Sequence, residues 1–480
     1  MLFNSYVFPI FFLIVWSLYL CLKHKPQNVM LVFASYFFYA WWDWRFLSLL
    51  FISTITDFLI AKSMGKCGPN RQGTKNVLLF ISLATSLGIL GFFKYFNFFV
   101  HSFTRMVSPL GWHPDFVTLN IILPAGISFY TFQTMAYTID VYRGKDKVCK
   151  NFTDFALYVA YFPSLMAGPI ERSQNLIPQI QKRREVTWPM LCSGAQLILM
   201  GYFKKVFVAD GVAPVVNECF NTPDQFGGIS LFFGVLLFVI QIYGDFSGYT
   251  DIARGVSRLF GIELMVNFRQ PFLSKTTTEF WQRWHISLSS WLREYLYYPL
   301  MYSLMDRTGL RTLCLYVSLM TTMLICGLWH GASWKFVVFG GLQGTFLCME
   351  AVLLQSRLWK RFSKFLAMLR LESILGIITT VTLFALCSVF FRANSCSAAL
   401  VYLSKIVHGG WNGFDAVWLY CWFYGGCILI LDYLCTVQDS EVPFTDRWWV
   451  PARAFGYACM VFLLVFIGEN DVQPFIYFQF

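Results

Sequence analysis

Residues 313–349 read LCLYVSLMTTMLICGLWHGASWKFVVFGGLQGTFLCM, an apolar stretch interrupted by one histidine and one lysine. A transmembrane helix needs about 20 apolar residues, so this stretch predicts two crossings with a break near its centre. We place the spans at about 313–328 and 336–354, with Trp329-His330-Gly331 at the break. An imidazole held at bilayer depth is costly unless it is used, so His330 indicates a functional site inside a membrane protein.

The composition of the whole chain is that of a polytopic membrane protein. Its 480 residues are 57% hydrophobic and 13% charged, and the mean hydropathy is +0.55. Aromatic residues reach 19%, which suits lipid-facing helices better than the short alternating strands of a membrane barrel. We predict an all-α polytopic fold of about eleven or twelve transmembrane helices, with re-entrant and interfacial amphipathic helices around a central cavity.

The formal net charge of +11 comes from Lys and Arg residues in the loops between apolar runs. The first, third and fifth loops are basic, which predicts that they are cytoplasmic and that the N-terminus is outside. Such charges contact anionic lipid, so membrane lipid is a predicted partner and nucleic acid is not. The 14 cysteines lack C-x-x-C spacing, so neither a metal site nor a disulfide framework is predicted.

Two segments break the regular alternation of spans and basic loops. Segment 152–170 lies between two basic loops and contains Pro163 and Gly168-Pro169, so we predict a re-entrant or interfacial structure. Segment 241–261 carries four glycines and four charged residues, and we predict the same for it. The chain contains no long polar stretch. We therefore predict one domain, 1–480, with N-terminal helices 1–140, a catalytic core 141–354 and C-terminal helices 355–480.

A second histidine lies in residues 279–296, which predict one amphipathic helix in the membrane interface. His285 falls on its apolar arc with Trp281, Trp284, Leu288 and Trp291. A lone histidine on such a face is most often a hydrogen-bonded core residue. However, His285 and His330 are 45 residues apart, about one loop and one span, so their rings can meet. Without a carboxylate cluster nearby, a neutral imidazole acting as a general base fits better than a metal ligand.

These motifs together resemble the membrane-bound O-acyltransferase superfamily, and within it the membrane subunits of bacterial alginate and peptidoglycan O-acetyltransferases. The resemblance covers nearly the whole chain. The motifs that carry it are Glu279-Phe280-Trp281, Arg283-Trp284-His285-Ile286-Ser287-Leu288-Ser289, Gly327-Leu328-Trp329-His330-Gly331-Ala332-Ser333-Trp334, Gly168-Pro169-Ile170-Glu171-Arg172, the segment 245–253, Asn267-Phe268-Arg269-Gln270-Pro271-Phe272 and the terminal segment 474–480.

The resemblance implies a multi-pass enzyme of the bacterial cytoplasmic (inner) membrane. His330 would be the essential catalytic histidine and His285 the second. It also implies a cytoplasmic acyl thioester donor, most often acetyl-CoA as a substrate, with no bound cofactor. The acetyl group would serve O-acetylation of an extracytoplasmic polysaccharide such as alginate or peptidoglycan. Because the chain offers no extracytoplasmic domain with a nucleophilic serine, we expect an acetyl-accepting transferase partner outside the membrane.

Four further residues are candidates for substrate binding: Asp251, Asn267, Arg269 and Trp329. Each has a structural alternative. Asp251 can pair with Arg254 at helical spacing, Asn267 and Arg269 can hold a loop together, and Trp329 can be a packing wall.

Other activities remain open at this point. D-alanyl transfer to teichoic acid belongs to a related enzyme, and a proton-coupled exporter would also place His and Asp residues in the membrane. A structural scaffold for a secretion complex is a third alternative, and a polyprenol-dependent glycosyltransferase is disfavoured because the first external loop offers only Asp43.

Overall fold

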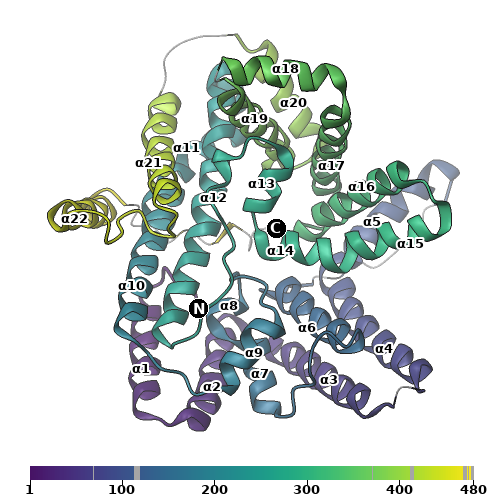
Figure 1. Ribbon diagram of the computed structural model, residues 1–480. Coiled ribbons are helices and arrows are strands. Elements are labelled where there is room, and N and C mark those ends of the chain that lie inside the picture. The colour runs from purple at the N-terminus through teal and green to yellow at the C-terminus, as the bar shows by residue number, and fades with distance from the viewer. Residues whose placement is uncertain are drawn as a thin grey trace. The chain divides into compact units, whose positions relative to one another are not determined.

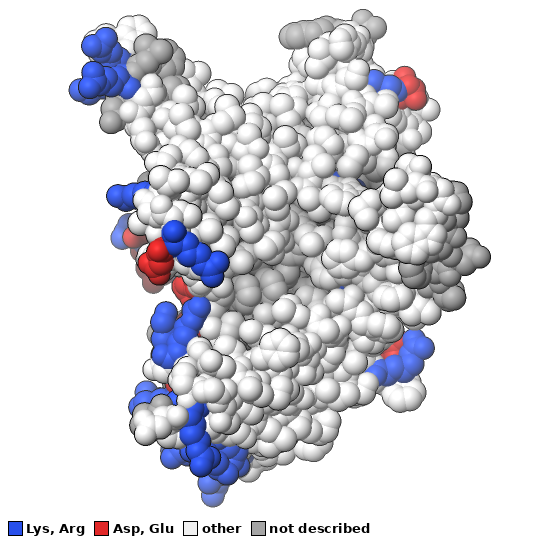
Figure 2. Space-filling view, turned by 90° about the vertical axis from the view of Figure 1, so that its right-hand side faces the viewer, with Lys and Arg blue, Asp and Glu red and all other residues white. Residues whose placement is uncertain are grey.

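The computed structural model describes residues 1–68, 70–112, 119, 121–369, 371–410, 416–468, 473 and 475–476. All regular elements among these residues are helices (Figure 1), which confirms the predicted all-α class. Eight helical stretches are long and apolar enough to cross a membrane, and three shorter apolar helices accompany them. Large hydrophobic side chains such as Phe33, Phe80 and Trp422 are exposed along these helices. Figure 2 shows Lys, Arg, Asp and Glu in a few groups with wide uncharged areas between them. The chain is a multi-pass membrane protein.

The chain divides into two compact units, and the first comprises residues 1–195 and 253–265. In it, α3 and α4 pack on each other and on α6, whose side chains are almost all buried. Its helices are α1 Val7–Cys21, α2 His24–Asp43, η1 Trp44–Phe46, α3 Leu47–Lys66, α4 Gln72–Leu90, η2 Gly91–Tyr95, α5 Phe96–Val107, η3 Ser108–Leu110, α6 Ile127–Tyr142, α7 Phe152–Ala160, α8 Phe162–Leu165 and α9 Ser173–Gln181.

Segment 152–170 is broken, as predicted. It forms the short helices α7 and α8, separated at Tyr161, and both are far shorter than a span. Directly after it, the carboxylate of Glu171 is fully buried. It accepts hydrogen bonds from the backbone N–H of Met265 at 2.6 Å and the side-chain amide of Asn175 at 2.8 Å. Glu171 therefore ties the loop after α8 to the extended segment after α12.

Glu171 gives this unit a testable dependence on pH. Burial raises the pKa of Glu171 from 4.5 to about 7, against the opposing effect of its hydrogen bonds. Between these pH values the folded state holds a proton that the unfolded state has lost, so the contribution of Glu171 to stability falls as pH rises. The full difference is on the order of 3 kcal/mol. We expect the stability of Glu171→Gln to depend less on pH than that of wild type, measured as the melting temperature from pH 4.5 to 8. If the melting temperatures of wild type and the variant changed with pH in parallel, Glu171 would not be the cause of the dependence.

The second unit comprises residues 196–252 and 266–480 and contains both predicted catalytic histidines. Helices α10 Trp188–Tyr202 and α12 Gly228–Leu259 each have residues in both units. The remaining elements of the second unit are η4 Phe203–Asp210, α11 Gly211–Asn221, η5 Pro223–Gln225, η6 Pro271–Leu273, α13 Thr277–Arg283, α14 Ile286–Leu292, η7 Arg293–Tyr297, α15 Tyr298–Thr308, α16 Arg311–His330, α17 Trp334–Gln355, α18 Arg357–Met368, α19 Glu372–Arg392, α20 Cys396–His408, α21 Ala416–Gln438 and α22 Val450–Phe466.

The prediction of a broken segment at 241–261 is wrong, because α12 is one continuous helix of 32 residues. Its glycines serve close packing. A Cβ at Gly248 would lie 2.7 Å from the carbonyl oxygen of Gly201, and a Cβ at Gly201 would lie 2.6 Å from that of Gly248. Small residues allow membrane helices to approach this closely. The acidic side chains of α12 in this unit are paired with lysines, so the helix does not need to unwind around them.

The prediction that residues 279–296 form one continuous amphipathic helix is also wrong. The segment forms α13, a break at Trp284-His285, α14 and then the π-helical turn η7. The predicted apolar face is nevertheless buried, since Trp281, Trp284, Leu288 and Trp291 are each at most 8% exposed. The break occurs because His285 adopts a left-handed conformation with φ 45° and ψ 53°.

Helices α16 and α17 are an antiparallel pair at the predicted spans and pack more extensively than any other two elements. Their contact is built on glycines. A Cβ at Gly327 would lie 2.1 Å from the carbonyl oxygen of Phe336, and a Cβ at Gly340 would lie 2.2 Å from that of Met323. Real Cβ atoms do not approach backbone this closely, so the two helices can only meet here through glycine.

We expect Gly340→Ala to destabilise the protein by about 1–3 kcal/mol, the usual cost of adding volume to a packed interior. The neighbouring Gly341→Ala is the matched control, because its Cβ meets nothing closer than Leu324 at 3.4 Å. Thermal unfolding in detergent compares the two variants. Equal melting temperatures would contradict the role of Gly340 in helix contact.

Candidate active site

His330 is the last residue of α16. Gly331 is extended, and a Cβ there would lie 2.1 Å from the ring of Phe336, so any larger residue would require this ring to move away from its position beside the site. The side chain of His330 is 4% exposed. Its ring lies 5.3 Å from that of Phe391 and 5.1 Å from that of Trp329, and its Nε2 lies 4.0 Å from the sulfur of Cys326. The imidazole is therefore held inside the helices and does not face lipid.

His285 is fully buried and is positioned by Asn267. The side-chain oxygen of Asn267 lies 3.1 Å from Nδ1 of His285 and accepts hydrogen bonds from the N–H and hydroxyl of Ser287 at 3.2 and 2.9 Å. The backbone carbonyl of Asn267 accepts from the N–H of Ile286 at 2.9 Å. Three consecutive residues around the left-handed turn are thus tied to one asparagine.

This contact also sets the protonation of His285. An amide oxygen can only accept, so Nδ1 donates its hydrogen, and Nε2 carries the lone pair when the ring is neutral. Burial, together with the neighbouring His330, lowers the pKa of His285 well below its ordinary value. The ring is therefore neutral at physiological pH.

The structure brings the two histidines together. Their ring centroids are 6.5 Å apart, with Trp329 beside both rings. This distance is too long for a direct hydrogen bond between them, yet it allows both to contact one substrate group. The described residues contain no group of three or more His, Cys, Asp or Glu side chains that could bind a metal ion. The arrangement can perform acid–base chemistry in a site shielded from bulk water.

The other candidate residues occupy different positions. Trp329 is buried against both histidines, as a wall of the site. The backbone N–H of Arg269 donates to the carbonyl of Arg283, whereas its side chain is exposed. Asp251 forms an ion pair with Lys204 at 2.8 Å instead of the expected pair with Arg254. Arg254 pairs with Glu263 at 3.2 Å. Of these candidates, Trp329 contacts both histidines and Asn267 contacts His285.

A group of ionised side chains lies behind the site, and we call it the α12 ionic cluster. The ammonium of Lys205 is 2.7 Å from both Asp210 and Asp245, and the second oxygen of Asp245 accepts the N–H of Ile476 at 2.6 Å. Burying charges is expensive unless they are paired, and this pairing explains how the cluster is tolerated inside membrane helices. Its members are Lys204, Lys205, Asp210, Asp245 and Asp251.

The α12 ionic cluster supports the wall that carries His285. Phe246, next to Asp245, packs its ring edge-on against His285 with centroids 4.6 Å apart. Tyr243 donates to Asp432 at 2.9 Å and packs on Trp284 at 6.0 Å. Sequence reasoning missed Lys204, Lys205 and Asp432. Charged residues inside predicted spans were the available signal, but their pairing joins segments far apart in the chain.

Lys335 is another residue that sequence reasoning missed. Its ammonium donates to the carbonyl oxygens of Ala393 at 2.8 Å and Phe391 at 3.4 Å, at the end of α19. A cation at a helix C-terminus is favourable because the carbonyl groups there carry partial negative charge. Phe391 contacts His330 with its ring, so Lys335 fixes one wall of the site. The signal was a lone lysine in an apolar run, five residues after His330.

His330 ends α16 at its junction with α17, and His285 lies beside it in the break between α13 and α14. The comparison with protein families shows the class of protein that contains this buried pair. Residues 145–396 match the model of the membrane-bound O-acyltransferase family. The chain belongs to this family and is an acyltransferase enzyme.

The chain is similar to several named acyltransferases of this kind. The chain is 42% identical to a probable alginate O-acetylase of Azotobacter vinelandii over 354 residues, which is 74% of this chain and 69% of the relative. It is 34% identical to the peptidoglycan O-acetyltransferase of Helicobacter pylori, with 100% of this chain and 98% of the relative covered. It is 30% identical to a teichoic acid D-alanyltransferase of Streptococcus thermophilus over 54% of this chain and 65% of the relative.

Proposed function

We propose that the chain moves an acetyl group from cytoplasmic acetyl-CoA across the membrane, for O-acetylation of an extracytoplasmic polysaccharide such as alginate or peptidoglycan. The buried pair of His285 and His330 is the observation that carries this proposal. The relatives named as O-acetylases are more similar and cover more of the chain than the D-alanyltransferase. These comparisons favour acetyl over D-alanyl transfer, and the family favours an enzyme over a proton-coupled exporter.

In the proposed mechanism, neutral His330 is the general base. It takes the proton of the acceptor hydroxyl while the hydroxyl oxygen attacks the thioester carbonyl, which forms a tetrahedral intermediate. The intermediate collapses, the carbon–sulfur bond breaks, and the CoA thiolate leaves and receives the proton. Because the single proton of the attacking hydroxyl goes to His330, the lone pair on Nε2 of His285 accepts a hydrogen bond from a second donor group of the bound acceptor and so orients it. Basic loops on the cytoplasmic side attract the phosphates of the donor.

The acceptor hydroxyl belongs to an extracytoplasmic transferase partner, which passes the acetyl group to the polymer. To test substrate and partner, membranes carrying the chain are incubated with radiolabelled acetyl-CoA and either alginate or peptidoglycan, with and without the extracytoplasmic fraction. We expect label in one polymer, and only when that fraction is present. Full-rate labelling without it would remove the partner. No label in either polymer, together with transfer from a D-alanyl donor, would overturn the acetyl assignment.

A further inference from the structure

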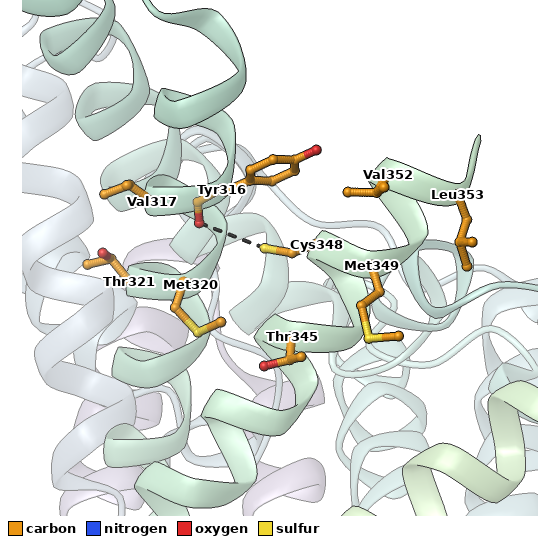
Figure 3. Close-up of a pocket in the computed structure, with 9 residues that line it drawn as sticks. All are labelled: Tyr316, Val317, Met320, Thr321, Thr345, Cys348, Met349, Val352 and Leu353. Carbon is orange, nitrogen blue, oxygen red and sulfur yellow. Dashed lines mark hydrogen bonds between the residues drawn. The ribbon is translucent and has the colours of Figure 1, made fainter. Parts of the chain in front are cut away.

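An open groove runs between α16 and α17 on the surface of the second unit (Figure 3), separate from the histidine pair. Its volume is about 630 Å³. Val317, Met349 and Val352 are each between 39% and 52% exposed. Both helices are long and apolar enough to cross the membrane, so the groove faces lipid. The residues that line it are Tyr316, Val317, Met320, Thr321, Thr345, Cys348, Met349, Val352 and Leu353.

The walls of the groove are suited to hydrocarbon. Two of its polar side chains are satisfied by backbone carbonyls. The hydroxyl of Thr345 donates to the carbonyl of Gly341 on its own helix at 2.8 Å. The thiol of Cys348 on α17 donates to the carbonyl of Tyr316 on α16 at 3.8 Å (Figure 3). From Thr345 to Leu353 the groove follows about 12 Å of helix, at 1.5 Å per residue. A groove of this size, in helices surrounded by lipid, fits part of one acyl chain.

The register of the two helices places positive charge at one end of the groove. Met320 lies opposite Gly344 and Tyr316 opposite Cys348, so Arg311 lies near Leu353. Arg357 begins α18 just beyond the end of α17. Both arginines are exposed. Exposed arginines at the end of a membrane span attract the phosphate of anionic lipid.

We propose that this groove binds an anionic phospholipid, with one acyl chain between α16 and α17 and the phosphate at Arg311 and Arg357. The charge at the mouth selects an anionic headgroup, and the apolar walls hold the chain. Because α16 ends at His330, the bound lipid would stabilise the helix pair that carries the catalytic base. The lipid site does not depend on the identity of the acyl donor or acceptor.

Native mass spectrometry of the purified full chain tests this site by titration with phosphatidylglycerol or phosphatidylcholine of identical acyl chains. We expect wild type to bind the first phosphatidylglycerol at least tenfold more tightly than phosphatidylcholine. Val352→Trp fills the groove and should weaken the binding of both lipids. Leu354→Trp is the matched control, because Leu354 is 52% exposed but does not line the groove.

A second pair of variants separates headgroup from chain. The double change Arg311→Gln and Arg357→Gln should abolish the preference for phosphatidylglycerol and retain binding of phosphatidylcholine. The double change Arg45→Gln and Arg105→Gln removes two exposed arginines outside the basic cytoplasmic loops and should behave as wild type. Thermal unfolding confirms that each variant is folded. Wild-type lipid affinity in Val352→Trp, or an unchanged lipid preference in the Arg311 and Arg357 variant, would overturn the proposal.

Discussion

Replacing His330 with glutamine should lower the rate of acetyl transfer by about 10²–10⁴, the range typical of a lost general base. Glutamine keeps much of the volume that contacts Phe391 and Trp329, and it retains hydrogen-bonding groups, but it cannot accept a proton at neutral pH. The loss should therefore appear mainly in kcat, with the melting temperature little changed. His330→Ala should lose at least as much activity and also some stability, because it leaves a cavity.

The matched control for this prediction is His101→Ala, because His101 is exposed in the first unit. Steady-state transfer of radiolabelled acetyl groups compares the three variants with wild type. If His330→Gln kept more than a tenth of the wild-type kcat, His330 would not be the general base, whatever its packing role.

The second large effect is expected at Asn267. Changing it to alanine removes the shared acceptor of His285 Nδ1 and of the N–H and hydroxyl of Ser287. Buried donors left without an acceptor cost about 1–3 kcal/mol each, and the left-handed turn at His285 loses its support. We expect a loss of several kcal/mol in stability and at least tenfold in kcat. Thr250→Val removes only the longest contact of Asn267, at 3.5 Å, and should have a small effect.

The variant Asn267→Asp distinguishes orientation from packing. A carboxylate beside Nδ1 favours the charged ring and should raise the pKa of His285 above its wild-type value. His285 would then be protonated at a higher pH than in wild type, and its Nε2 could no longer accept. The acid limb of the rate profile should move to higher pH, measured as kcat from pH 5 to 8. An unchanged profile would show that His285 does not take part in the reaction.

The parts of the site that follow the local pattern of the chain could be predicted. The two spans that flank His330 and the buried face around His285 depend on hydropathy and periodicity, which the sequence contains. The meeting of the two histidines also followed, because one loop and one span separate them. The spans and the buried face follow from the residues within each segment, and the meeting of the histidines follows from the length of chain between them.

The features that were mispredicted or missed depend on distant contacts. The break at His285 is imposed by Asn267, 18 residues earlier, and overrides a clear helical pattern. The glycines of α12 indicated a broken segment, but Gly248 is required by Gly201 on another helix. Likewise, Lys204 neutralises Asp251 from 47 positions away. A single sequence does not state which distant side chains become neighbours.

Transport of label through sealed vesicles tests the central claim most directly. The protein is reconstituted, radiolabelled acetyl-CoA is supplied on the side of the basic loops, and the extracytoplasmic fraction with the polymer is placed on the other side. The account predicts label on the polymer with wild type and His101→Ala, and at least a hundredfold less with His330→Gln. Label transfer by His330→Gln at the wild-type rate would contradict the buried imidazole as the base of this reaction.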